Sequence, residues 1–160
     1  GFTKSVIYYY LNSKNEILWR IFCRILETYF KSLERIASAD MEPGAKLTSI
    51  VKHHALEVMT HRDWTAIFHR DEPELDEKQR KHVARKTRQY DAVIEEVYRD
   101  GVVRGVFRDI PAHVAVASLI GSCNWIHTWY DPEGPLSAET IATYYAEMLA
   151  NGFLAPRSNG

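Results

Sequence analysis

The chain has 160 residues, of which 46% are hydrophobic and 26% charged, and its formal net charge at pH 7 is −1. This composition indicates an ordinary soluble protein that can bury one sizeable core, and the net charge alone neither favours nor excludes nucleic acid. The two cysteines lie a hundred residues apart with no spacing pattern, so a disulfide framework is excluded and reduced thiols in the cytoplasm are expected.

The first stretch of the chain predicts two helical segments joined by a turn. A short helix is expected from Thr3 to about Tyr10, and Asn12 and Ser13 should break it. Ser13 and Glu16 then have the spacing of a capping box that opens a second helix. From Ser13 to about Ala39 the apolar residues recur every three or four positions, which predicts one long helix.

The remainder of the chain also predicts helices only. Apolar residues at helical spacing predict helices over residues 45–61, 75–100, 111–130 and 137–151, and Asp63 is expected to cap a short helix that follows the first of these. Residues 110–130 carry no formal charge, but Pro111, His113, Asn124 and His127 favour a buried helix over a membrane span.

Residues 1–10, GFTKSVIYYY, form a motif together with Asn12-Ser13-Lys14 and Leu18. This run resembles the recognition helix and following turn of the TetR family of transcriptional repressors, although Leu11 stands where Phe is commoner. The resemblance implies an all-α fold with a helix-turn-helix head, followed by a helical ligand-binding and dimerisation domain. It also implies a repressor and no enzyme.

The resemblance divides the chain in two. Residues 1–39 are expected to be the C-terminal part of a helix-turn-helix DNA-binding domain and its connecting helix, and residues 40–160 the effector-binding and dimerisation domain. Because the family's motif begins earlier, the first helix and most of the second are expected to be absent from this chain.

The short first helix has the size and the polar groups to enter a major groove. Lys4 and Ser5 are the candidates for base edges, and the other polar residues are expected to contact phosphates or thymine methyls. Three consecutive tyrosines cannot all face inward on one helix, which disfavours a purely structural role. The candidate residues for operator DNA are Thr3, Lys4, Ser5, Tyr8, Tyr9, Tyr10 and Lys14.

Large apolar residues with a few polar ones on the middle helices predict a cavity for a small hydrophobic effector. Packing of an ordinary core is the alternative interpretation of each residue. Ser122-Cys123-Asn124-Trp125 and the later Trp129-Tyr130 resemble a TetR subgroup that responds to acyl-CoA thioesters. The basic run 78–88 can attract their phosphates or simply form a solvated helix face. The candidate effector residues are His54, Met59, Trp64, Phe68, His69, Tyr90, Ile94, Asn124 and Trp125.

The last two predicted helices have small residues on one and an apolar stripe on the other, which suits a four-helix homodimer interface. Closing the monomer core is the alternative, and the family resemblance favours the dimer. The candidate interface residues are Ser118, Gly121, Ser122, Ile141, Tyr145 and Met148.

No nucleophile elbow, phosphate loop or dinucleotide motif occurs, and the histidines lack metal-ligand spacing with carboxylate support. We therefore expect no enzyme, no cofactor and no metal site. Two other functions fit the sequence less well, a metal-sensing regulator and a helical interaction module without DNA function.

Overall fold

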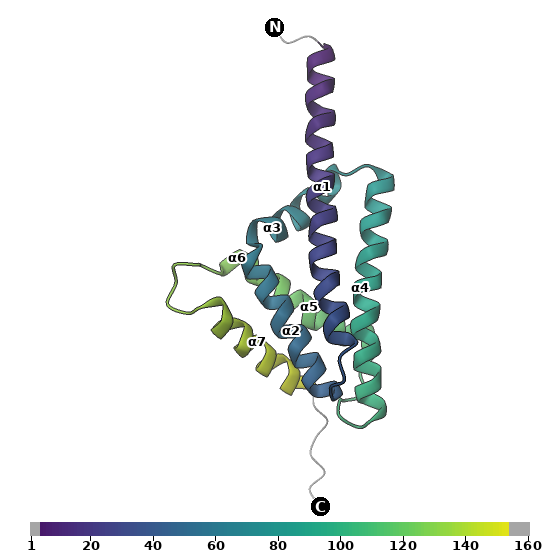
Figure 1. The fold of residues 1–160 in the computed structure, drawn as a ribbon, viewed down its shortest axis with the longest axis vertical. Coiled ribbons are helices and arrows are strands. Elements are labelled where there is room, and N and C mark those ends of the chain that lie inside the picture. Colours follow the sequence, from purple (N-terminus) through teal and green to yellow (C-terminus); the bar gives the residue numbers. More distant parts are fainter. Residues whose placement is uncertain (1–3, 154–160) are drawn as a thin grey trace, which may run out of the picture.

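The computed structural model describes the backbone of residues 4–153 and the side chains of residues 14–152. Within that range the chain forms helices and no β-strand, which confirms the all-α prediction (Figure 1). The elements are α1 (Lys4–Ala37), α2 (Pro43–Thr60), α3 (Arg62–Asp71), the 3-10 helix η1 (Glu72–Glu74), α4 (Glu77–Val103), α5 (Ala112–Asn124), α6 (Ile126–Trp129) and α7 (Ala138–Phe153).

The predicted break at Asn12 and Ser13 is wrong, because α1 runs through both residues as one helix. Propensity is a weak preference that the structural context can override. Figure 1 shows the first turns of α1 extending past the ends of the other helices, so the backbone hydrogen-bond ladder simply continues.

The predicted helix over residues 111–130 is also divided in two, at Trp125. Side chains take over carbonyl groups at this break: the imidazole Nδ1 of His127 lies 2.6 Å from the carbonyl oxygen of Asn124. The hydroxyl of Thr128 donates to the carbonyl of Trp125 over 2.8 Å. Such local side-chain bonds compete with the helical ladder. A smaller correction concerns Asp63, which lies in the first turn of α3, whereas His61 is the N-cap.

The main core surrounds α2, which packs against α7, α4, α5 and α1. Leu47, Val51, Ala55 and Val58 are fully buried and recur along one face of α2. A second cluster of buried apolar residues joins α1 to the corner between α3 and α4; its buried members are Leu18, Phe22, Leu75 and Val83. From Leu18 onward, helix α1 is therefore packed against the rest of the molecule.

Polar contacts also stabilise the corner between α3 and α4. Asp76 and Gln79 form the capping box that begins α4, with each side chain accepting a backbone N–H of the other. The Gln79 amide also donates to the Asn15 side-chain oxygen over 3.2 Å, and the Asn15 amide donates to the carbonyl of Glu74 over 3.3 Å. These bonds link the start of α4 to the described N-terminal part of α1.

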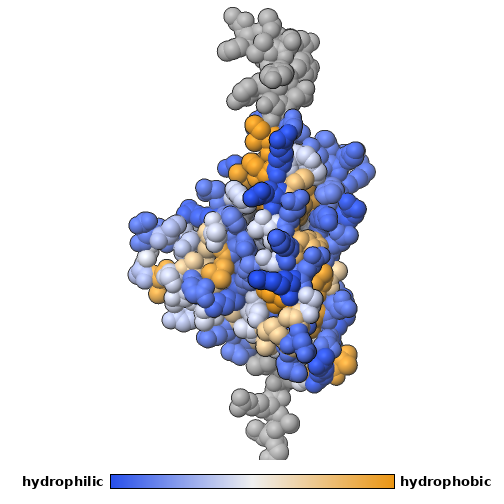
Figure 2. Space-filling view, in the orientation of Figure 1, coloured by the Kyte–Doolittle hydropathy of each residue, from blue (hydrophilic) through white to orange (hydrophobic). Residues whose placement is uncertain are grey.

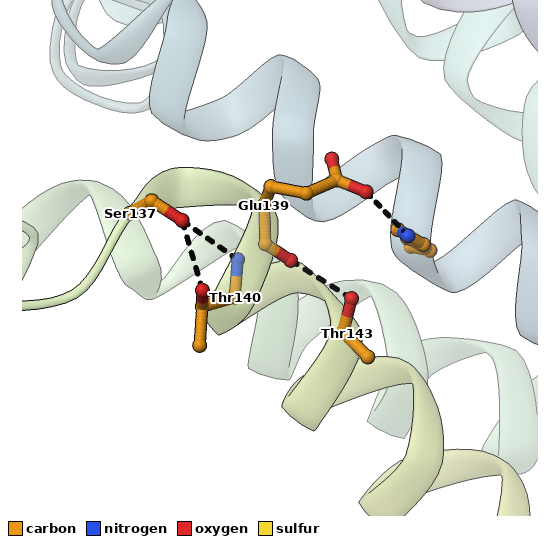
Figure 3. Close-up of polar contacts among 5 residues, drawn as sticks. Ser137, Glu139, Thr140 and Thr143 are labelled. Carbon is orange, nitrogen blue, oxygen red and sulfur yellow. Dashed lines mark hydrogen bonds and ion pairs between the residues drawn. The ribbon is translucent and has the colours of Figure 1, made fainter.

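The final helix is attached to α2 at its first turn (Figure 3). The hydroxyl of Ser137 accepts the backbone N–H of Thr140 over 3.2 Å, which confirms the predicted start of this helix. The carboxylate of Glu139 pairs with the ammonium of Lys52 on α2 at 2.5 Å. Helix α7 thus lies against α2 and leaves its opposite side facing outward.

Candidate functional site

A cavity opens between α1, α2, α3, α4 and α5, with an interior volume of about 80 Å³. Its wall is mostly apolar, with a few polar side chains, as in small-molecule sites of proteins. The lining residues are Ile25, Leu26, Tyr29, Phe30, His54, Thr65, Phe68, His69, Thr87, Tyr90, Asp91, Ile120 and Asn124.

A buried histidine links two walls of this cavity. The Nε2 of His54 lies 2.9 Å from the side-chain oxygen of Asn124, and its Nδ1 lies 2.8 Å from the hydroxyl of Tyr90. Burial lowers the pKa of His54 to about 4, so the ring is neutral at pH 7. Because the oxygen of Asn124 can only accept, the hydrogen-bond network assigns the proton to Nε2. Nδ1 then accepts from Tyr90, whose pKa is raised well above its ordinary value by burial.

A second polar chain crosses from α1 to α3. The hydroxyl of Tyr29 lies 3.2 Å from that of Thr65, which in turn donates to the carbonyl oxygen of His61 over 3.3 Å. Tyr29 therefore donates to Thr65. Burial raises the pKa of Tyr29, so its hydroxyl stays protonated at pH 7. These groups give the cavity neutral hydrogen-bonding sites on an apolar wall.

His69 and Asn124 also line a neighbouring surface hollow, which includes Arg70, Trp125 and His127. The rings of His69 and His127 stack with centroids 5.6 Å apart. Burial and the neighbouring His127 lower the pKa of His69. The guanidinium of Arg70 forms two hydrogen bonds with the carboxylate of Asp71.

Of the nine predicted effector residues, the structure brings five together in the cavity wall, namely His54, Phe68, His69, Tyr90 and Asn124. Met59 and Ile94 lie instead in the packed core. Trp125 is 66% exposed and lies in the neighbouring hollow. Helical spacing of apolar residues identifies the inward face of a helix. That face contacts both the core and the cavity, so the spacing does not distinguish a core residue from a lining residue.

Trp64 lies on the opposite side of α3 and stacks on the ring of His61 with centroids 4.2 Å apart. It lines a groove with Ile17, Arg20, Ile21 and Arg24 of α1. Figure 2 shows hydrophobic residues on this upper part of α1, next to hydrophilic ones. Trp64 is therefore separated from the cavity that contains five of the other predicted effector residues.

The sequence reasoning missed eight lining residues, among them four from α1: Ile25, Leu26, Tyr29 and Phe30. Their apolar spacing was recognised, but it was interpreted only as the buried stripe of a connecting helix. Of these four residues, Tyr29 gives a sequence indication of a cavity, because a buried hydroxyl in an apolar stripe needs a polar partner. The remaining four are Thr65, Thr87, Asp91 and Ile120.

The candidate DNA residues fall mostly outside the described part of the chain. The position of Thr3 and the side chains of Lys4, Ser5, Tyr8, Tyr9 and Tyr10 are outside the described residues. Lys14 is described and is exposed on α1.

The candidate dimer residues divide into an outer and an inner set. Ser118, Gly121 and Met148 are exposed, and Ser122 and Tyr145 are half-buried. Ile141 is buried in the core, because its side of α7 packs on α2. The outward face also carries exposed apolar side chains that were not predicted, Val114, Trp129 and Tyr144.

The histidines of α2 and its end flank one carboxylate: His53 and His61 lie 3.6 and 3.4 Å from Glu57. Among the described residues, no group of three or more His, Cys, Asp or Glu could hold a metal ion. None of the helices in the described range is long and apolar enough to cross a membrane.

Comparison with known proteins places these features in a family. Residues 40–153 match the family model for the tetracyclin repressor-like, C-terminal domain. The HTH-type transcriptional repressor KstR2 of Mycolicibacterium smegmatis is 24% identical over 155 residues, which cover 95% of this chain and 75% of that protein.

Two solved structures have the same fold over nearly all of the chain. A transcriptional regulator of the TetR/AcrR family from Thermobifida fusca has a TM-score of 0.80 and 30% identity, covering 97% of this chain and 82% of that one. AibR, in complex with isovaleryl coenzyme A and operator DNA, has a TM-score of 0.76 and 21% identity over 97% of this chain and 82% of its own.

Proposed function

The chain belongs to the TetR family of transcriptional regulators, and we propose that it is a repressor that binds operator DNA as a dimer and releases it when an acyl-CoA thioester binds. Family members are DNA-binding regulators that respond to small molecules, and they are not enzymes. The observation that carries the proposal is the composition of the cavity wall, which takes four residues from α1.

The position of α1 connects the cavity with the candidate DNA residues. This helix contributes Ile25 and Tyr29 to the cavity, and its N-terminal turns contain residues 4–13 of the recognition motif. A ligand that separates α1 from α3 would move the recognition helices of a dimer relative to each other. Two such helices must match half-sites roughly 34 Å apart, so a small displacement weakens binding. The ligand achieves this only if it binds the displaced form more tightly.

The lining favours the acyl part of a thioester as the buried portion of the effector. Neither lysine nor arginine lines the cavity, so the phosphates of coenzyme A have no partner inside it and belong outside. AibR is a relative in fold that binds isovaleryl coenzyme A, which supports this ligand class for the chain. The resemblance of Ser122-Cys123-Asn124-Trp125 to the acyl-CoA-responsive subgroup supports the same class of ligand. Trp125 lies in the hollow beside the cavity.

Operator release by isovaleryl-CoA is the first expected result. Saturating isovaleryl-CoA should lower the operator affinity of the full-length protein about tenfold, within the usual range of allosteric coupling. Fluorescence anisotropy would measure the operator affinity, on an operator selected from a random duplex pool.

Coenzyme A without an acyl group is the ligand control and should not change the operator affinity. Ile120→Trp, which fills the cavity, should keep operator binding and lose the response. An unchanged affinity at saturating acyl-CoA, across acyl chains of several lengths, would contradict the proposal.

The dimer is proposed to form through the outward face of α5, α6 and α7. Met148 is 62% exposed there, among Trp129 and Tyr144. Met148→Glu should raise the dimer dissociation constant at least about tenfold, because a buried methionine contributes roughly 1.5–3 kcal/mol. Val103→Glu makes the same exchange at a residue that is 86% exposed at the end of α4, and it should leave the dimer intact. Sedimentation velocity would measure both. An equal effect of the two variants would exclude this face as the interface.

The two other functions predict different results. A metal-sensing regulator would lose or gain operator affinity when chelators are added. An interaction module without DNA function would show no salt-dependent binding to any duplex. Both measurements use the same anisotropy assay.

A further inference from the structure

Among the described residues, the wall of the effector cavity contains one carboxylate and neither lysine nor arginine. The carboxylate belongs to Asp91, on α4. The histidine at its centre, His54, is neutral at pH 7 because burial lowers its pKa to about 4. A negatively charged ligand group inside the cavity would therefore meet a like charge and no compensating one.

The carboxylate of Asp91 has an unused capacity to accept hydrogen bonds. It is half-buried, and no hydrogen bond or ion pair to it is found among the described side chains. Its neighbours differ in this respect: Tyr90 donates to His54, and Glu95, one turn along α4, pairs with Arg99. Burial, with a contribution from the charge of Glu95, raises the pKa of Asp91. A carboxyl group that lines a cavity in this way gains from a ligand that brings a donor.

Hydroxyl and ammonium groups are two of the ligand donors that can satisfy a carboxylate. The rest of the wall favours the hydroxyl, because Ile25, Phe30 and Ile120 make it largely apolar and no second anion is available. Burial of an ammonium among these residues carries a large desolvation cost, which a single half-buried carboxylate offsets poorly. A hydroxyl group loses much less on leaving water.

We propose that the buried part of the effector is uncharged and carries a hydroxyl group that donates a hydrogen bond to the carboxylate of Asp91. This inference rests on the proposed function, since it assumes that the cavity is the effector site. It narrows the effector from any apolar thioester to one with a hydroxylated acyl or alicyclic part. Asp91 is then a residue that determines specificity.

A pair of isomers tests the proposal without knowledge of the natural effector. Hexan-1-ol and methyl pentyl ether have the same atoms and almost the same size, but only the alcohol donates a hydrogen bond. Isothermal titration calorimetry on the full chain should show that the alcohol binds at least about tenfold more tightly, as expected for a hydrogen bond to a charged group. Hexylamine is the third probe and should bind more weakly than the alcohol.

Variants assign the preference to Asp91. Asp91→Leu should reduce the preference for the alcohol to about one, and Asp91→Asn, which keeps the size and an acceptor oxygen, should leave a severalfold preference. Glu96→Leu removes an exposed carboxylate from the same helix and should keep the full preference. Circular dichroism would establish that each variant is folded, and Asp91→Asn serves as the readout where Asp91→Leu fails this test.

The outcomes separate this inference from the proposed function. Equal binding of alcohol and ether, a preference that survives in Asp91→Leu, or tighter binding of hexylamine would each overturn the role of Asp91. None of these results affects operator release by acyl-CoA. Failure of all three probes to bind would overturn the role of Asp91, whereas the proposed function is decided separately by operator release with acyl-CoA.

Discussion

Replacement of Phe22 by alanine is expected to lower the free energy of unfolding by about 3–5 kcal/mol, the usual cost of removing a buried phenylalanine. Phe22 is fully buried in the cluster that joins α1 to the corner between α3 and α4. Its ring stacks on that of Phe68 with centroids 5.0 Å apart. Phe68 in turn lines the cavity, so this contact joins the cavity wall to α1.

The same substitution would remove one contact between the cavity wall and α1, the helix that contains the candidate DNA residues. Without the ring of Phe22, a displacement of α3 by an effector would no longer be transmitted to α1 through this contact. Ile17→Ala removes a residue that is 57% exposed on the same helix and is the matched control. Urea denaturation followed by circular dichroism would give the free energy of unfolding of each variant. A loss below about 1 kcal/mol for Phe22→Ala would mean that the cluster does not hold α1 in place.

The inward faces of the helices were predictable because their apolar residues recur at helical spacing. On α2, the predicted inward residues Leu47, Val51, His54 and Val58 are all buried. The prediction of which inward residues line the cavity was weaker. Met59 and Ile94 lie in the core, whereas His54, Tyr90 and Asn124 line the cavity. The polar residues on inward faces were thus the better markers, because a buried polar group requires partners that a close-packed core does not offer.

The course of α1 and the limits of α5 depended on contacts that no local pattern contains. Asn12 and Ser13 favour a break in the helix by their intrinsic preferences, yet the ladder continues through them. Trp125 favours no break, yet the helix is interrupted there, at the point where the side chains of His127 and Thr128 bond to the carbonyl groups of Asn124 and Trp125. Both results reflect the weakness of single-residue propensities against tertiary and local side-chain contacts.

The stability of the protein is expected to fall as the pH is lowered from 7 to 4, with a contribution of about 3 kcal/mol from His54 alone. The pKa of His54 is about 4 in the folded protein, against an ordinary value of 6.5. Above pH 6.5 the ring is neutral in both states and contributes no pH dependence. Between 6.5 and 4 the unfolded chain binds the proton more readily, so each step down in pH favours unfolding. Below about 4 both forms are protonated and the loss levels off.

The groups around His54 determine this direction. Tyr90 and Asn124 hold its two nitrogens, and Asn124 raises the pKa, as an acceptor of the Nε2 proton does. Burial opposes this and is the larger effect, and the nearby His53 and His69 lower the pKa further. Tyr29 packs edge-on against the ring with centroids 5.1 Å apart and adds no charge at these pH values. Protonation of Nδ1 would also reverse its bond with Tyr90, which now donates to it.

The contribution of His54 can be isolated by a difference measurement. His54→Gln keeps one acceptor and one donor for Tyr90 and Asn124 but does not titrate, so urea denaturation from pH 7 to 4 should show a loss smaller by about 3 kcal/mol than in the wild type. His53 and His69, whose pKa values are lowered in the same direction, remain in both proteins and cancel in the difference. His113→Gln makes the same exchange at an exposed histidine and is the matched control. Parallel profiles for wild type and His54→Gln would mean that the pKa of His54 is the same in the folded and unfolded protein, so that burial does not lower it.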